Sequence, residues 1–128
     1  MNKKDYLILG IVFGTIVFLW GIWLLTDKKA QNEVYIIVDN TEVFSCDLYD
    51  NKYVVLIKGQ VNVYDDADTA NNVFSDNAEA TNLIYVTGGK VDVVEARCPD
   101  KICVNSICID AGGESIVCMP NRAAVSIR

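Results

Sequence analysis

The stretch ARCPDKICVNSICIDAGGESIVCMPNR, residues 96–122, contains four of the five cysteines of a 128-residue chain. They are Cys98, Cys103, Cys108 and Cys118, in the spacing C-x4-C-x4-C-x9-C. This spacing differs from the paired knuckles of zinc modules and from the C-x4-C-x2-C pattern of plant-type iron–sulfur proteins. A thioredoxin-like C-x-x-C is also absent. Disulfide bonding in a small domain is therefore the leading interpretation, and metal ligation and thiol redox chemistry are the alternatives.

Two prolines favour a structural bridge between Cys98 and Cys118. Pro99 and Pro120 follow these cysteines closely, so each should end a strand beside its cysteine. Strands that end side by side bring two Cβ atoms to the ~3.8 Å that a disulfide needs. A bridge that closes ~20 residues adds roughly 3 kcal/mol of stability. Cys103 is a poorer partner for Cys98, because a helix starting at Pro99 would hold the two Cα atoms ~8 Å apart.

Around this stretch, short runs of β-branched and aromatic residues alternate with turn residues, which predicts β-hairpins. The tightest turn is expected at Gly88-Gly89, because glycine adopts a positive φ without steric cost. Two further strands are predicted at residues 116–119 and 123–127. The paired runs are VYIIV (34–38) with TEVFS (41–45), YVVLI (53–57) with VNVY (61–64), and NLIYV (82–86) with VDVVE (91–95).

One short helix is predicted in this domain, from Pro99 to about Asn105, because proline suits the first helical position and Asp100 suits the first turn. The polar, acidic segment DDADTANNVFSDNAEA, residues 65–80, is expected to be a loop. The predicted fold is therefore mainly β, a small barrel or sandwich with one short helix.

The N-terminal segment YLILGIVFGTIVFLWGIWLL, residues 6–25, has no charged residue. A helix of this length spans ~30 Å, the thickness of the hydrocarbon core of a bilayer. A cleaved signal peptide is the alternative, but its apolar core is shorter, ~7–15 residues, and ends in small residues. We therefore expect a single transmembrane helix that contacts the lipid bilayer. Within it, Gly10 and Gly14 form a small-xxx-small motif, a candidate for a weak homodimer.

The expected organisation is a tail at residues 1–5, the transmembrane helix at 6–25, a linker at 26–33 and a β domain at 34–128. Two lysines flank each side of the helix, so the positive-inside rule alone leaves the orientation open. The cysteine content favours an oxidising compartment. We expect a single-pass cell-membrane protein with its C-terminal domain outside the cytoplasm.

The charge of the β domain restricts its partners. Residues 34–128 have 14 Asp and Glu against 7 Lys and Arg, a net charge of −7. Binding of nucleic acid is not expected, because phosphate contacts need clustered basic residues. The chain has no histidine, which excludes Ser-His and Cys-His nucleophile pairs and all metal sites that use imidazole. We therefore expect no enzyme activity and no cofactor.

The motifs EARCPDKICV and IVCMPNR, with the hairpin before them and the strand after them, resemble the NusG domain II family of small bacterial proteins, most of them membrane-anchored. The resemblance covers residues 82–127 and implies a small barrel-like β fold without an established activity. The family motif corresponds to Cys98, Pro99, Asp100, Cys103, Cys118, Pro120 and Asn121.

The chain departs from the family pattern at Ile107 and Cys108, where a glycine and an aromatic residue are usual. Cys46 and Cys108 are additions to the three cysteines of the family, and they are candidates for a second bridge. The expected function is that of a membrane-tethered extracytoplasmic β domain, a non-catalytic interaction or accessory module with an unknown membrane or extracytoplasmic protein partner. The alternative is a redox accessory protein whose clustered cysteines act as cycling thiols or metal ligands.

Overall fold

The computed structural model describes residues 2–25 and 32–128 of the chain. The chain forms two compact units, residues 1–30 and residues 31–128. Most of the predicted linker, residues 26–31, lies outside the described residues.

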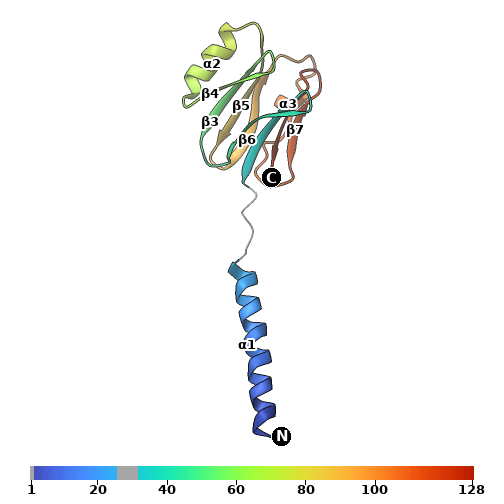
Figure 1. Ribbon diagram of the computed structural model, residues 1–128. Coiled ribbons are helices and arrows are strands. Elements are labelled where there is room, and N and C mark those ends of the chain that lie inside the picture. The colour runs from blue at the N-terminus through green and yellow to red at the C-terminus, as the bar shows by residue number, and fades with distance from the viewer. Residues whose placement is uncertain (1, 26–31) are drawn as a thin grey trace. The chain divides into compact units, whose positions relative to one another are not determined.

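The first unit is one helix, α1 (Lys3–Leu25), drawn in blue in Figure 1. From Lys3 to Leu24 the helix is long and apolar enough to cross a membrane. Its large apolar side chains are exposed along the helix; Phe13 and Phe18, for example, are each 69% exposed. The predicted N-terminal apolar helix is therefore present, and by length and composition it suits either a membrane span or a signal sequence.

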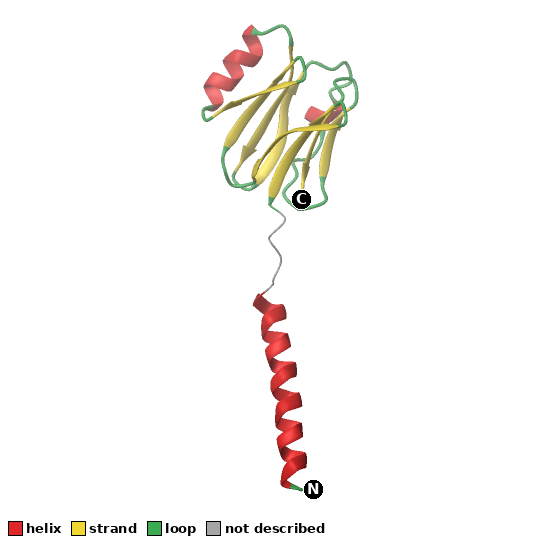
Figure 2. Cartoon of the chain, viewed as in Figure 1, coloured by secondary structure: helices red, strands yellow, loops and turns green. Residues whose placement is uncertain are grey.

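The second unit is a β-sandwich with short helices, as Figure 2 shows in yellow and red. Its strands are β1 (Glu33–Val38), β2 (Thr41–Asp47), β3 (Lys52–Ile57), β4 (Gln60–Tyr64), β5 (Ala80–Thr87), β6 (Lys90–Ala96), β7 (Ser115–Cys118) and β8 (Ala123–Ile127). One antiparallel sheet has the order β2-β1-β8-β7, and the other has the order β4-β3-β5-β6. The predicted mainly β fold is confirmed, in its sandwich form.

The main core lies between the inner faces of the two sheets. Ile36 and Val125 of one sheet and Leu56 and Ile84 of the other are at most 2% exposed and belong to the same cluster. Burying an aliphatic side chain of this size contributes about 1.5–3 kcal/mol. The alternation of buried and half-exposed residues along β1 and β8 matches a sheet with one face covered.

The three predicted hairpins are confirmed as β1–β2, β3–β4 and β5–β6. Gly88 and Gly89 have φ of 60° and 74°, the left-handed values that a two-residue turn between β5 and β6 needs. The strand predicted at residues 123–127 is β8, which lies between β1 and β7. The domain's first and last strands are thus paired, and Val34 lies opposite Ile127.

The segment 65–80 was expected to be a loop, and this prediction is wrong, because it contains helix α2 (Ala67–Asp76). The Asp66 side chain caps the helix by accepting a hydrogen bond from the Thr69 backbone N–H over 2.9 Å. Ala70 and Phe74, one turn apart, are 0% and 5% exposed and pack on Leu83 of β5. The helix therefore covers the outer face of the β4-β3-β5-β6 sheet, as Figure 1 shows in yellow-green.

The helix expected from Pro99 to Asn105 is shorter than predicted: α3 runs Ile102–Asn105. Pro99 and Asp100 form a bend before it. Lys101 then adopts a left-handed conformation, with φ of 51°. Cys98 and Cys103 are therefore separated by a bend and a left-handed residue and are not joined by continuous helix.

Candidate functional site

Three cysteines converge at one point of the sandwich. Cys98 follows the end of β6, Cys103 lies in α3, and Cys118 is the last residue of β7. Their three Sγ atoms lie within 4.8 Å of one another. The Sγ atoms of Cys98 and Cys103 are 3.6 Å apart. The residues are 6%, 1% and 4% exposed, respectively, so the cluster is buried.

The sheet topology brings these cysteines together. β6 and β7 are edge strands of the two sheets, and α3 contacts both strands. Ile109 forms a β-bridge with Val91 of β6, which holds the segment after α3 against the β6 edge of its sheet. Lys101 forms an ion pair with Glu95 of β6, which positions the start of α3. The cluster therefore lies where α3 joins the edges of the two sheets.

Cys103 lies beside Cys98, although the predicted helix from Pro99 would have kept the two residues apart. The prediction that Cys103 is a poor partner for Cys98 is wrong because the helix begins at Ile102 and not at Pro99. Within the described residues, no two cysteine sulfurs lie at disulfide distance. A bridge between Cys98 and Cys118 stays a prediction, and Cys103 is a third sulfur within reach of both.

Cys46 and Cys108 are not part of this cluster. Cys46 lies in β2, and Cys108 lies between α3 and β7; both are half-buried. Burial raises the pKa of Cys46 to about 11, and the carboxylates of Asp50 and Asp47 add to the shift. A second bridge between Cys46 and Cys108 stays a prediction.

Cys118 has polar partners inside the core. Asn82 of β5 is 1% exposed, and its side chain forms a hydrogen bond with the Cys118 sulfur. The Asn121 backbone N–H also donates to this sulfur. Burial acts to raise the pKa of Cys118, but these bonds, with those from Cys103 and Cys98, outweigh it and lower the pKa. The site therefore favours the negative charge of a thiolate at Cys118.

The pKa of Cys103 is shifted in the opposite direction from that of Cys118. Burial raises its pKa to about 12, and hydrogen bonding to Cys118 and then Cys98 raises it further. Between these two thiols, loss of a proton therefore favours a thiolate at Cys118 over one at Cys103.

A surface pocket of about 270 Å³ opens onto the three cysteines. Its other lining residues are Asp100, Ile102, Val117, Met119 and Pro120. Ile102 and Met119 are 67% and 76% exposed, so apolar side chains surround the entrance. A carboxylate and a thioether lie in the same pocket as the three sulfurs.

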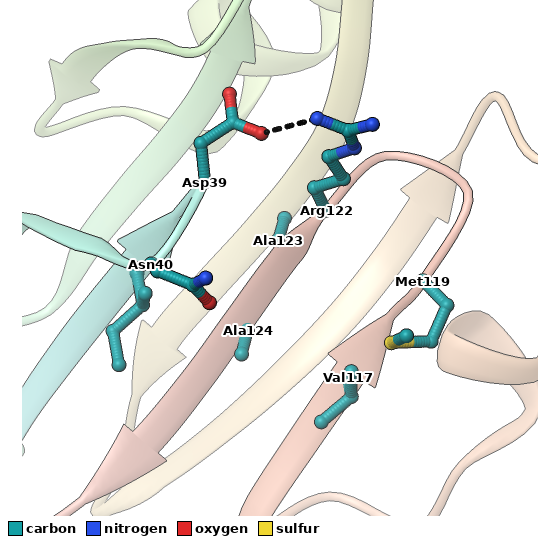
Figure 3. Close-up of a pocket in the computed structure, with 8 residues that line it drawn as sticks. Asp39, Asn40, Val117, Met119, Arg122, Ala123 and Ala124 are labelled. Atoms are coloured by element: carbon teal, nitrogen blue, oxygen red, sulfur yellow. Dashed lines mark hydrogen bonds and ion pairs between the residues drawn. The ribbon is translucent and has the colours of Figure 1, made fainter.

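A second pocket of about 470 Å³ shares Val117 and Met119 with the first. Figure 3 shows this pocket, in which Asp39 and Arg122 face each other at one end. An exposed Arg122 nitrogen lies 3.4 Å from the Asp39 carboxylate. The pocket contains no cysteine, so Val117 and Met119 separate the sulfur cluster from a polar depression.

Most residues of the predicted motif belong to the site. Asp100 and Pro120 line the pocket, and Pro99 lies in the exposed bend before α3. Asn121 contacts the cluster through its backbone N–H. Sequence reasoning missed Asn82, and the only available signal was one amide in the apolar run NLIYV.

Solved structures provide the comparison for the fold. A DUF1312 family protein from Enterococcus faecalis is 25% identical, with a TM-score of 0.51, over 75% of this chain and 94% of that one. The Lin0431 protein from Listeria innocua is 20% identical, with a TM-score of 0.53, over 75% and 95%. A DUF1312 family protein from Ruminococcus gnavus is 28% identical, with a TM-score of 0.37, over 61% and 97%.

No curated protein matches the chain. The family model for NusG domain II matches residues 7–128, which include most of α1 and the whole β-sandwich. The chain therefore belongs to the NusG domain II family.

Proposed function

We propose that the protein is a membrane-tethered, extracytoplasmic accessory domain that acts by binding a partner and not by catalysis. The observation that carries the proposal is α1, whose apolar side chains are exposed along its length and which forms a unit separate from the β domain. An apolar helix of this length is stable in a bilayer, where all its backbone polar groups are paired internally. The tether would concentrate the β domain at the membrane.

The surface around the cysteine pocket is suited to a protein partner. Ile102, Val117 and Met119 line this pocket and are 67%, 45% and 76% exposed. Exposed apolar side chains that gather on one surface favour association with another protein. The partner would be a membrane or extracytoplasmic protein, because the tether restricts the domain to that location.

The location can be tested with protease on intact cells whose outer layers have been made permeable. We expect residues 34–128 to be digested while a cytoplasmic marker protein stays intact. Digestion only after lysis would contradict the extracytoplasmic location. Release of the full-length chain into the soluble fraction by carbonate would contradict the tether.

The binding surface can be tested with a photo-crosslinking residue at position 119. A matched control places the same residue at position 76, an exposed site in α2. We expect a defined cross-linked partner from position 119 and none from position 76. Equal patterns from both positions would exclude a specific role for the pocket surface.

A second candidate function is a redox accessory protein. It is supported by the three Sγ atoms within 4.8 Å, since any two of them could pair after small movements. Two electrons and two protons would pass between this pair and a dithiol or disulfide of a partner. Titration against glutathione buffers tests it: reversible oxidation at a mild potential supports cycling, and an inert pair contradicts it.

A further inference from the structure

We infer that Cys98, Cys103 and Cys118 form a three-thiolate binding site for one Zn²⁺ ion. This inference goes beyond the tethered binding domain and does not depend on the membrane location. A failed zinc test would therefore leave the proposed function standing, and a cytoplasmic location would leave the zinc site standing.

The distances agree with metal coordination. Tetrahedral zinc binds thiolate sulfur at ~2.3 Å, which places its sulfur ligands ~3.8 Å apart. The Sγ atoms of Cys98 and Cys103 are already 3.6 Å apart. All three sulfurs lie within 4.8 Å of one another, so movements of about an ångström would complete the geometry.

The number of sulfurs also favours a metal ion. A disulfide uses two sulfurs and needs them ~2.05 Å apart. Here a third sulfur, that of Cys103, is 1% exposed and meets the other two from a separate element. One ion would use all three sulfurs and would join β6, α3 and β7 across the edges of the two sheets.

The surroundings are suited to thiolate ligands. Asn82 is 1% exposed and lines the same small pocket as Cys118, and Asn121 follows Cys118 by three residues. Asn121 is itself held in place, since its Nδ2 donates to the Asn82 Oδ1 over 3.0 Å and to the Thr81 carbonyl over 3.1 Å. Outer partners of this kind orient metal ligands and stabilise their charge.

Charge favours Zn²⁺ over Cu⁺. Three thiolates with Zn²⁺ have a net charge of about −1, whereas with Cu⁺ the net charge is about −2. The more negative complex is disfavoured in a buried position of an acidic domain. Asp100 and Met119 line the pocket beside the sulfurs, so a carboxylate, a thioether or a water could take the fourth position.

Zinc binding and a Cys98–Cys118 bridge are mutually exclusive states of one cluster. Binding displaces the thiol protons, up to three for each ion, and leaves the oxidation state of sulfur unchanged. A bridge instead removes two of the three ligands. The experiment must therefore begin with fully reduced protein and count its free thiols.

The test uses the full chain, purified in detergent without oxygen and with a thiol-free reductant. Zn²⁺ is added, the excess is removed by gel filtration, and bound zinc is measured by atomic emission and native mass spectrometry. We expect one zinc per chain. Zinc-free protein in which all the cluster thiols are titrated as free would overturn the inference.

Matched variants locate the site. Cys98→Ser, Cys103→Ser and Cys118→Ser should each lose stoichiometric zinc, whereas Cys46→Ser and Cys108→Ser should keep it. Cys103→Ser is decisive, because a two-cysteine bridge does not need Cys103. Full zinc occupancy in Cys103→Ser would overturn the site.

A measurement on the unaltered chain covers the case in which a variant fails to fold. Zn²⁺ should slow alkylation of Cys98, Cys103 and Cys118 at least about tenfold, because coordination removes the free thiolate. Alkylation of Cys46 and Cys108 should not change. Equal protection of all five thiols, or of none, would overturn the inference, and stoichiometric binding of Cu⁺ but not Zn²⁺ would overturn the choice of metal.

Discussion

The side chain of Asn121 donates a hydrogen bond to the Oδ1 atom of Asn82 over 3.0 Å, although Asn82 belongs to one sheet and Asn121 to a turn of the other. Within residues 2–25 and 32–128, Asn82 is the one buried polar residue. Asn82 also lines a small pocket together with Cys118. The pair therefore connects the packing of the sandwich with the sulfur cluster.

Replacing this buried amide should reduce both stability and metal affinity. We expect Asn82→Leu to lower the free energy of unfolding by about 1–3 kcal/mol, because Asn121 loses its buried acceptor. Zinc affinity should fall about 10–100-fold, as for other outer partners of metal ligands. Urea unfolding and competition with a zinc chelator measure the two effects.

The matched control for Asn82→Leu is Asn72→Ala, an exposed position in α2. This change should alter the unfolding free energy by no more than about 0.5 kcal/mol. If Asn82→Leu behaved like Asn72→Ala, the hydrogen bonds around Cys118 would have no energetic role.

The cap of α2 should make stability depend on pH. Hydrogen bonds from Thr69, first from its backbone N–H, lower the pKa of Asp66. A lowered pKa means that the contribution is present above the ordinary pKa of ~3.9 and is lost as the pH falls through the folded value. Asp66→Ala should therefore lower the melting temperature at neutral pH and have a smaller effect below about pH 3.

The non-titrating variant Asp66→Asn separates the cap from the charge, because asparagine also caps helices well. It should keep most of the stability at neutral pH and show less dependence on acid. A constant difference between wild type and Asp66→Ala across the pH range would contradict the assigned cap.

Cys46 should react slowly with alkylating reagents. With a pKa of about 11, raised by burial and by Asp50 and Asp47, roughly a thousandth of the thiol is ionised at about pH 8. Alkylation at Cys46, followed by peptide mass spectrometry, should accelerate as the pH approaches 11. The double variant Asp47→Asn, Asp50→Asn should react faster at pH ~8, and an unchanged rate would contradict the electrostatic part of the shift.

The motif formed by Gly10 and Gly14 provides a test of homodimers. An added Cβ at either glycine would meet no other atom within 4 Å, so this face of α1 is open in the single chain. If two helices pack through it, Gly14→Leu should reduce membrane cross-linking. Val12→Leu, on the opposite side of the helix, is the control, and equal cross-linking in both variants would exclude the motif.

Oxidation of the metal-free chain should form the predicted bridge. We expect oxygen to join Cys98 to Cys118 and to raise the free energy of unfolding by about 3 kcal/mol over the reduced chain. Cys103→Ser should keep this gain, and Cys118→Ser should lose it. A non-reducing peptide map that joins Cys98 to Cys103 would contradict the pairing.

The hairpins were predictable because their signals are local. Alternating apolar residues on either side of Gly88-Gly89 specify both the strands and the turn between them. Helix α2 was missed because its composition is polar, although Asp66, Ala70 and Phe74 already formed a cap and a one-sided apolar stripe. The apolar stripe of α2 is recognisable as a buried helix face only together with the sheet on which it packs.

The site was only partly predictable. Cys98 and Cys118 were paired from the prolines that follow them; their sulfurs lie within 4.8 Å of each other, and the bridge between them stays a prediction. Cys103 was left out because Lys101 adopts a positive φ, which is uncommon for a non-glycine residue and has no local signal. The contact between Asn82 and Cys118 depends on the packing of two sheets, which no short stretch of sequence encodes.

The pairing of β1 with β8 affects the order of folding during synthesis. Glu33 and Arg128 exchange two backbone hydrogen bonds, at 3.0 and 2.9 Å, and β8 separates β1 from β7. While the ribosome is still adding residues before β8, the β1–β2 hairpin has one unsatisfied edge and cannot complete its sheet. Cooperative folding of this sandwich is thus a late event, and a nascent chain arrested before residue 123 should remain sensitive to protease and dependent on chaperones.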